Sequence, residues 1–257
     1  MKLRLPALLA VFTIALSSLG ARSGEIRSLW VLPWSINTPQ SIDQVIAKAV
    51  ANNQTEILVE VRYRSDALYK TNRVEDEYPN PEPQSYILND SDFDPLAYAI
   101  TEGHKQNLNV QAWVIVFNST PLLPELLAKN YMYRNHREWF TWDSAGRSNG
   151  KNQEFGYFID PGIPDVQTYL LNVLGDITSG YPDLDGIHLD YIRYPNAQYG
   201  YHPISKARFN LYREQGHDID FNQWRVLQVT QFVEKLHAQT RRINPKLLLT
   251  AAVFADY

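Results

Sequence analysis

Three short apolar segments of the sequence carry polar or aromatic side chains at alternate positions. The pairs of residues spaced by two are Glu60 and Arg62, Gln111 and Trp113, and His188 and Asp190. Because successive side chains of a β-strand point to opposite faces, the members of each pair share a face. The intervening residues are almost all apolar, so we expect the polar set to line the inside of a barrel and the apolar set to face helices.

Asp190 is the residue that we expect to do chemistry. Ionised groups inside a barrel cost free energy unless they are paired, so we expect an ion pair between Arg62 and Asp190 that keeps Asp190 charged. The expected layers are Arg62, Trp113 and Asp190 near the mouth, with Glu60, Gln111 and His188 one layer deeper. A charged carboxylate facing a cleft suits the nucleophile or oxocarbenium stabiliser of glycoside hydrolysis. The structural alternatives are that Asp190 caps a loop or bonds Arg193, and that Arg62 belongs to a structural ion pair.

Glycoside hydrolysis also needs a carboxyl group that donates a proton, and the sequence leaves its identity open. The candidates are Asp256, Asp160, Asp66 and Glu60. Asp160, in the segment Ile159-Asp160-Pro161-Gly162, is equally consistent with a turn or a helix cap. The expected catalytic residues are therefore Asp190, Arg62, Asp256 and Asp160.

Aromatic and polar residues near the same strands are candidates for substrate binding, because aromatic rings can stack on sugar rings. These candidates are His188, Trp113, Gln111, Tyr191, Tyr194, Asp66, Glu60 and Trp34. The alternative for Trp113 is a core residue, and for His188 and Gln111 a hydrogen-bonded place inside the sheet layer.

Five apolar runs rich in β-branched and aromatic residues predict strands, at residues 28–34, 56–63, 109–117, 185–192 and 247–255. Helical patterns separate them and begin near Thr38, Asp94, Pro164 and Phe221. Strands that alternate with helices predict a parallel sheet with right-handed crossovers, which is the α/β class. We expect the first five β strands of a (β/α)8 TIM barrel, in a truncated chain. The alternative is a complete doubly wound sheet, although the sequence lacks the glycine-rich turn that such folds often carry.

The long connections of the sequence also point to one face of such a barrel. They cover residues 63–94, 117–164 and 194–221, and each follows a predicted strand. Because loops that leave the carboxyl ends of barrel strands build the active site, we expect the site on this face.

The N-terminus has the features of an export signal. Lys2 and Arg4 precede an apolar stretch over residues 7–16, and small residues follow it. About ten apolar residues are too few to span a bilayer, where roughly 20 are needed, so we expect no stable membrane anchor. We therefore expect a signal peptide at residues 1–22, the barrel domain at residues 23–257, and a periplasmic or extracellular protein.

Composition narrows the classes of function. The chain of 257 residues contains no cysteine, and removal of Lys2 and Arg4 changes its formal charge from −4 to −6. The basic residues of the chain are scattered along the sequence. This disfavours nucleic-acid binding, because phosphate recognition needs a concentrated basic face. The six histidines are also dispersed, so we expect no metal or other cofactor. The sequence does not predict an oligomeric state.

Residues 185–195, Asp-Gly-Ile-His-Leu-Asp-Tyr-Ile-Arg-Tyr-Pro, closely resemble the strand-4 signature of glycosyl-hydrolase-like family 10. Blocks at residues 25–30, 61–69, 112–114 and 159–162 resemble other segments of the same family, in the same order. The sequence departs from the family at Ser28, Gln111, Ile115 and Tyr191, the last standing where many members have a second aspartate.

This resemblance implies a TIM-barrel enzyme with Asp190 aligned on the catalytic aspartate of strand 4. Family members with a known role resemble envelope hydrolases of peptidoglycan glycan strands that lack stem peptides. We therefore expect an exported glycoside hydrolase that acts on an envelope or extracellular polysaccharide. Peptidoglycan glycan strands are one candidate substrate. The alternative is a noncatalytic carbohydrate-binding protein on the same barrel.

Overall fold

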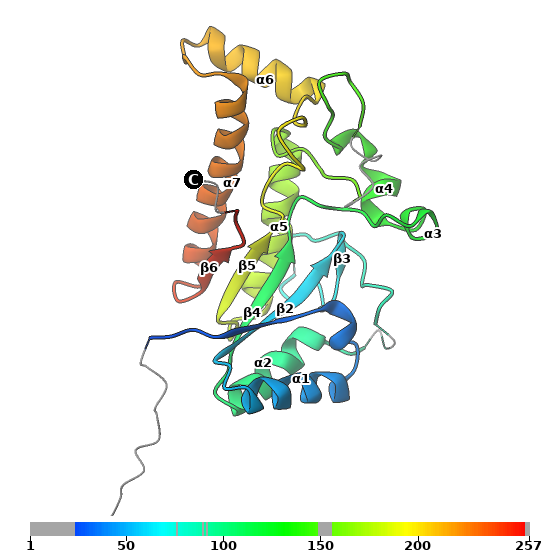
Figure 1. Cartoon of the computed structure of the whole chain (residues 1–257), viewed down its shortest axis with the longest axis vertical. Helices are drawn as coiled ribbons and strands as arrows, with labels where there is room; N and C mark the ends of the chain where they lie inside the picture. The colour runs from blue at the N-terminus through cyan, green and yellow to red at the C-terminus, as the bar shows by residue number, and fades with distance from the viewer. Residues whose placement is uncertain (1–23, 76, 89, 91, 149–155, 255–257) are drawn as a thin grey trace, which may run out of the picture.

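A parallel β-sheet forms the centre of the computed structural model, which describes residues 24–75, 77–88, 90, 92–148 and 156–254 (Figure 1). The parallel strands are β1 (Ser28–Val31), β2 (Glu56–Tyr63), β4 (Asn109–Ile115), β5 (Gly186–Asp190) and β6 (Leu248–Ala251). A short strand β3 (Asp66–Ala67) pairs antiparallel with the end of β2. The predicted signal peptide and Asp256 lie outside the described residues.

The order of the strands decides between the two predicted architectures. The parallel strands lie side by side in chain order, β1-β2-β4-β5-β6, and each pairs with the strand before it. A doubly wound sheet would reverse its direction at a switch point, whereas barrel strands are added in sequence to one edge. The fold is therefore α/β of the (β/α)8 barrel type, as predicted.

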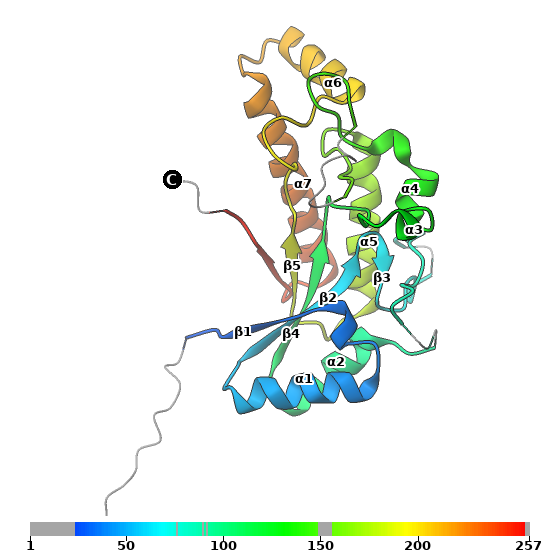
Figure 2. The same ribbon diagram turned by 45° about the vertical axis from the view of Figure 1, so that its right-hand side comes forward.

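Four long helices bury the apolar outer face of the sheet. They are α1 (Pro39–Ala51), α2 (Pro95–Lys105), α5 (Pro164–Gly180) and α7 (Phe221–Ile243). In both views α1 and α2 lie together, and α5 and α7 lie together (Figures 1 and 2). Val59, Ala112, Val114, Ile187 and Leu189 of the strands join one core with these helices. Burial of this face drives the sheet and helices together.

Local sequence signals explain where these helices begin. Thr38 and Asp220 each form a capping box with the residue three positions later, and Asp94 accepts a hydrogen bond from the backbone of Ala97. Pro39, Pro95 and Pro164 occupy first helical positions, where the missing N–H of proline costs nothing.

The connection predicted over residues 194–221 contains a helix that the sequence analysis did not assign. This helix, α6 (Pro203–Glu214), lies at the end of α7 away from the sheet (Figure 1). The connection after β4 holds the short helices α3 (Pro124–Leu127) and α4 (Tyr131–Asn135). Among the described helices, none is both long and apolar enough to cross a lipid bilayer.

A β-bulge in β2 changes the direction of Arg62. Glu60 pairs with Trp113, but Arg62 pairs with Val114, so the register shifts by one residue between them. A bulge places two residues of one strand opposite one of its neighbour, which reverses the alternation of side chains. Glu60 consequently faces the inside with Trp113, whereas Arg62 faces the outer side with Val114. The prediction that Glu60 and Arg62 share a face was wrong.

Candidate active site

Asp190 ends β5 on the inner face of the sheet, beside Trp113 of β4. The indole Nε1 of Trp113 donates a hydrogen bond to one carboxylate oxygen at 3.2 Å, and the backbone N–H of Tyr191 donates to the other at 2.7 Å. Tyr191 has a φ of 50°, an uncommon conformation for a bulky residue. These two donors hold the Asp190 carboxyl group at the carboxyl end of the strand, as the barrel geometry predicts.

Glu60 lies on the same inner face, two strands away. It is 3% exposed, and burial raises its pKa to about 8. Arg64 lowers this pKa and Asp190 raises it, so the two carboxyl groups act on each other electrostatically. Because β4 alone separates β2 from β5, the backbones that carry them are about 10 Å apart. Glu60, with a pKa of about 8, is thus protonated at neutral pH and lies on the same face of the sheet as Asp190.

The layers of side chains on the inner face differ from those predicted. The strand register places Glu60, Trp113 and His188 at one level, with Asp190 one step nearer the mouth. Gln111 lies a step deeper, opposite Gly186. The predicted layers, with Trp113 level with Asp190 and Gln111 level with Glu60 and His188, were therefore wrong, because the strand register sets the levels.

A hollow of about 340 Å³ adjoins Asp190. Tyr191, Arg193 and residues 252–254 line it together with Asp190. The guanidinium of Arg193 donates to the backbone carbonyls of Tyr194 and Pro195 and lies over the ring of Phe254. Asp190 is therefore accessible from the carboxyl ends of β5 and β6, which is a requirement for contact with a substrate.

A chain of hydrogen bonds fixes the deeper part of the inner face. Ser28 and Gln111 both donate to the Glu56 carboxylate, Thr250 donates to the Gln111 carbonyl at 2.9 Å, and His188 Nδ1 lies 2.8 Å from Thr250 Oγ1. Since the Thr250 hydroxyl proton points to Gln111, His188 Nδ1 is the donor in the last bond. Burial lowers the pKa of His188. Gln111 and His188 thus hold the layer beneath Asp190, which was the structural alternative for both.

Arg62 does not pair with Asp190. Its guanidinium is fully buried and forms an ion pair with Glu82 at 2.6 Å, on the opposite side of the sheet from Asp190. Tyr169 of α5 donates to the same Glu82 carboxylate at 2.7 Å. The predicted pair of Arg62 with Asp190 is therefore wrong, because the bulge turns Arg62 outward. The structural alternative for Arg62 holds instead.

Asp160 lies in a structural turn away from Asp190. Its buried carboxylate accepts hydrogen bonds from Thr141, Gly162 and Ser205, each at 2.8 Å. Burial raises its pKa, while these three donors lower it. Tyr194 has a buried hydroxyl near Asp160, and burial and the Asp160 carboxylate both raise its pKa. Asp160 and Tyr194 were predicted as site residues, but the structure does not bring them to the inner face beside Asp190.

Aromatic side chains line the rim near β1 and β2. Trp30 packs edge-on against Trp113 and His188, and Trp34, 57% exposed, packs edge-on against Tyr63. Trp113 is 8% exposed, which fits a residue that positions Asp190 better than an open stacking surface. Among the residues predicted to bind substrate, Trp34 has an exposed ring that a sugar can reach.

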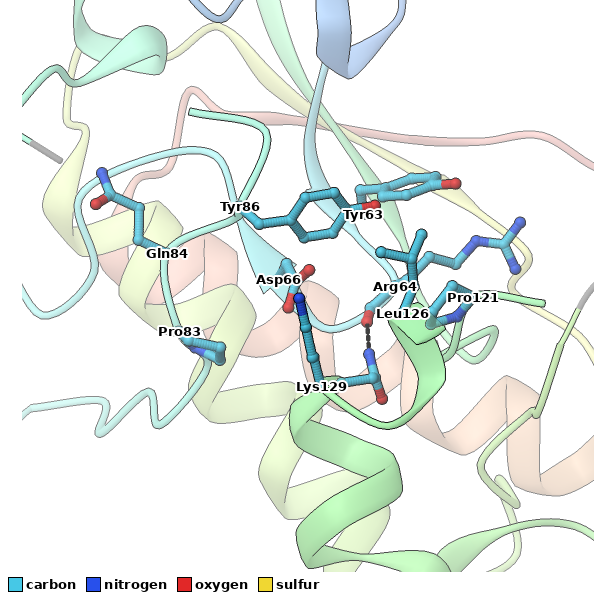
Figure 3. Close-up of a pocket in the computed structure, with 10 residues that line it drawn as sticks. Tyr63, Arg64, Asp66, Pro83, Gln84, Tyr86, Pro121, Leu126 and Lys129 are labelled. Atoms are coloured by element: carbon cyan, nitrogen blue, oxygen red, sulfur yellow. Dashed lines mark hydrogen bonds between the residues drawn. The ribbon is translucent and has the colours of Figure 1, made fainter. Parts of the chain in front are cut away.

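Asp66 lies in a separate pocket beside the end of β2 (Figure 3). The pocket has a volume of about 180 Å³, and Tyr63, Tyr86 and Lys129 are among its lining residues. Burial and the nearby Glu82 carboxylate together raise the pKa of Asp66 to about 7, against the opposing effect of Arg62. Asp66 therefore belongs to the rim, and Glu60 is the one predicted proton donor that the described structure places with Asp190.

Two residues near the site, and one on the opposite side of the sheet, were not predicted. Arg64 bonds Asn118 and Thr120 and supplies the positive charge that acts on Glu60. Glu56 shares the alternation of Glu60 within β2, so its place on the inner face could have been found from spacing. Glu82 lies between two prolines in a long connection, and no local pattern ties it to Arg62.

Carboxyl groups on the inner face, at the ends of parallel strands added in order, define a barrel protein of the glycoside-hydrolase-like class. The sequence profile of Glycosyl hydrolase-like 10 matches residues 25–257, and the chain belongs to this family.

Curated relatives share part of this sequence. The chain is 27% identical over 160 residues to the glycosyl hydrolase YngK of Bacillus subtilis, a match that covers 61% of the chain and 29% of the relative. It is 27% identical over 165 residues to the glycosyl hydrolase DigH of Escherichia coli, covering 60% of the chain and 34% of the relative. The chain thus spans about a third of the length of the curated relatives that it matches.

Solved structures show the same fold at low sequence identity. The glycoside hydrolase domain of PgaB (BpsB) from Bordetella bronchiseptica has a TM-score of 0.63 and 12% identity, covering 90% of this chain and 65% of that one. A hypothetical protein from Ruminiclostridium thermocellum has a TM-score of 0.56 and 16% identity, covering 89% and 97%. These likenesses support the barrel fold.

Proposed function

We propose that this protein is an exported glycoside hydrolase that cleaves O-glycosidic bonds in an envelope or extracellular polysaccharide. The observation that carries the proposal is the pair of carboxyl groups, Glu60 and Asp190, on one inner face. Glycoside hydrolysis requires one carboxyl group that is protonated and one that serves as nucleophile or base. Glu60, with a pKa of about 8, fills the first role at neutral pH, and Asp190 fills the second.

The surroundings of the pair support these roles. Trp113 and the Tyr191 backbone donate to Asp190, which leaves its accessible side to meet a sugar ring. Burial keeps the Glu60 proton in place until a leaving-group oxygen approaches, and the ring of Trp34 offers a surface for stacking on a neighbouring sugar. The family and the names of the relatives are consistent with this chemistry.

The location and substrate class form the finer part of the proposal. The N-terminal residues have the pattern of a cleaved export signal, which would bring the protein into contact with envelope glycans. Peptidoglycan glycan strands without stem peptides are the first substrate to test.

The test incubates the purified protein with such glycan strands and with soluble polysaccharides, and measures new reducing ends and product masses. We expect cleavage by the unmodified protein and a loss of roughly 100- to 10,000-fold in both Asp190→Asn and Glu60→Gln. Full activity in either variant would remove that residue from the mechanism. Glycan binding without any product from the unmodified protein would favour a noncatalytic carbohydrate-binding protein.

A further inference from the structure

The pocket beside the end of β2 is large enough for a ligand and takes no part in the acid/base pair. Its volume of about 180 Å³ far exceeds the roughly 10–15 Å³ that one water molecule needs. Asp66, Tyr63, Tyr86 and Lys129 line it, together with apolar side chains that include Leu126.

The Asp66 carboxyl group is buried in this pocket, and the described residues supply no hydrogen-bond donor to it. Asp66 is 8% exposed, and no hydrogen bond or ion pair to its carboxylate occurs within the described part of the chain. An unpaired buried polar group costs free energy that a packed apolar residue would not. Such a group in a pocket indicates that a partner from outside the chain satisfies it.

Arg62, the nearest buried cation, has no donor left for Asp66. A guanidinium has five N–H donors. Those of Arg62 go to the Glu82 carboxylate, the Ser65 hydroxyl, and the backbone carbonyls of Ile115 and Val116. Asp66 is therefore not the second half of a structural ion pair.

The walls of the pocket suit a sugar ring. Tyr86 is 59% exposed, and Figure 3 shows Tyr86, Asp66 and Lys129 as residues that line the pocket. Aromatic rings offer flat apolar faces with a polar edge. Because the lining carries charges of both signs, in Asp66, Arg64 and Lys129, a neutral polyhydroxyl ligand fits it better than a simple ion.

We propose that this pocket is a sugar-binding subsite, in which one pyranose residue packs against Tyr86 and donates hydroxyl hydrogen bonds to Asp66. The proposal rests on the glycan substrate proposed above and extends it to a second place on the surface. Tyr63 at the pocket lies three residues beyond Glu60 along β2, or about 10 Å. A glycan of several units is therefore long enough to span both places.

The test measures binding without turnover, in the Glu60→Gln protein as parent. Isothermal titration calorimetry with β-1,4-linked oligomers of N-acetylglucosamine and of glucose, two to six units long, gives the dependence of affinity on length. We expect Asp66→Ala and Tyr86→Ala each to weaken hexamer binding about tenfold or more, and to leave dimer binding within about twofold. The matched control is Asp92→Ala, which removes an exposed carboxylate outside the pocket and should change neither affinity.

The melting temperature separates a subsite from a structural role. Because Asp66 has no donor in the described structure, its removal should not lower the melting temperature of the parent. A lower melting temperature with unchanged hexamer affinity would overturn the subsite, as would the absence of binding by any oligomer to the parent.

The cleavage assay and the binding titrations together distinguish the two proposals. If the unmodified protein cleaves no glycan but hexamer affinity still depends on Asp66 and Tyr86, the catalytic proposal fails and the subsite stands. If it cleaves glycans and hexamer affinity is indifferent to both residues, the subsite alone fails.

Discussion

At the scale of single residues, burial on the inner face gives Glu60 and Asp190 different environments. Glu60 has little solvent and a raised pKa, whereas Asp190 lies beside a hollow with two donors. In the proposed function, this difference makes Glu60 the proton donor and Asp190 its partner, as glycosidic bond cleavage requires.

The pH dependence of activity follows from Glu60. Its pKa of about 8 in the free protein means that it holds its proton below that pH, so kcat/KM should fall as the pH rises through about 8. Glu60→Gln should retain little activity and lose this alkaline limb. Initial rates between about pH 5 and pH 10 check the prediction, and an alkaline limb that persists in the variant would assign it to another group.

Glu60 should also affect stability. Its pKa in the folded state lies above the unfolded value of 4.5, so the folded protein loses stability as the pH rises from about 4.5 to about 8. We expect Glu60→Gln to gain stability relative to the unmodified protein over that interval. Urea unfolding at several pH values measures it, and a difference independent of pH would contradict the burial of an ionisable Glu60.

Trp113 should act as a positioning residue for Asp190. Trp113→Phe keeps an aromatic ring but removes the Nε1 donor, so we expect kcat to fall about 10- to 100-fold with little change in KM. Trp30→Phe, at an exposed ring that bonds no carboxylate in the described structure, is the control. A rise in KM with unchanged kcat would instead make Trp113 a substrate contact.

At the scale of elements, the bulge in β2 decides the role of Arg62. By shifting the register after Glu60, it directs Arg62 to the helix side, where Glu82 and Tyr169 of α5 meet it. Arg62 consequently ties the connection after β3 to α5, and does not act on Asp190.

Breaking this pair should destabilise the fold strongly. Removal of one partner of a buried ion pair leaves an uncompensated charge, so Arg62→Met should lower the free energy of unfolding by about 3–5 kcal/mol. The double variant Arg62→Met with Glu82→Gln should recover part of the loss. Denaturant unfolding provides the measurement, and a loss below about 1 kcal/mol in Arg62→Met would contradict the buried pair.

At the scale of the whole molecule, the sheet separates packing from chemistry. Its outer face joins one apolar core with the helices, and its inner face carries the carboxyl, amide and aromatic groups. The long connections leave the carboxyl ends of the strands, where Asp66 and Asp190 lie at the rim.

Much of this could be predicted from the sequence because it depends on local patterns. Alternation fixed the inner face of β4 and β5, and capping residues and prolines gave the starts of α1, α2, α5 and α7. The order of strands and helices limited the fold to an α/β barrel or a doubly wound sheet.

Only the tertiary structure decided the partners of the charged residues. A bulge of one residue inverts every side chain after it and leaves no mark in the sequence of β2, so Arg62 and Asp190 were wrongly paired. The contact of Arg62 with Glu82 and the capping of Asp160 by Thr141 and Ser205 join segments far apart in the chain. Spacing along a strand specifies a face, but the choice of partner depends on which distant segment fills the space opposite that face.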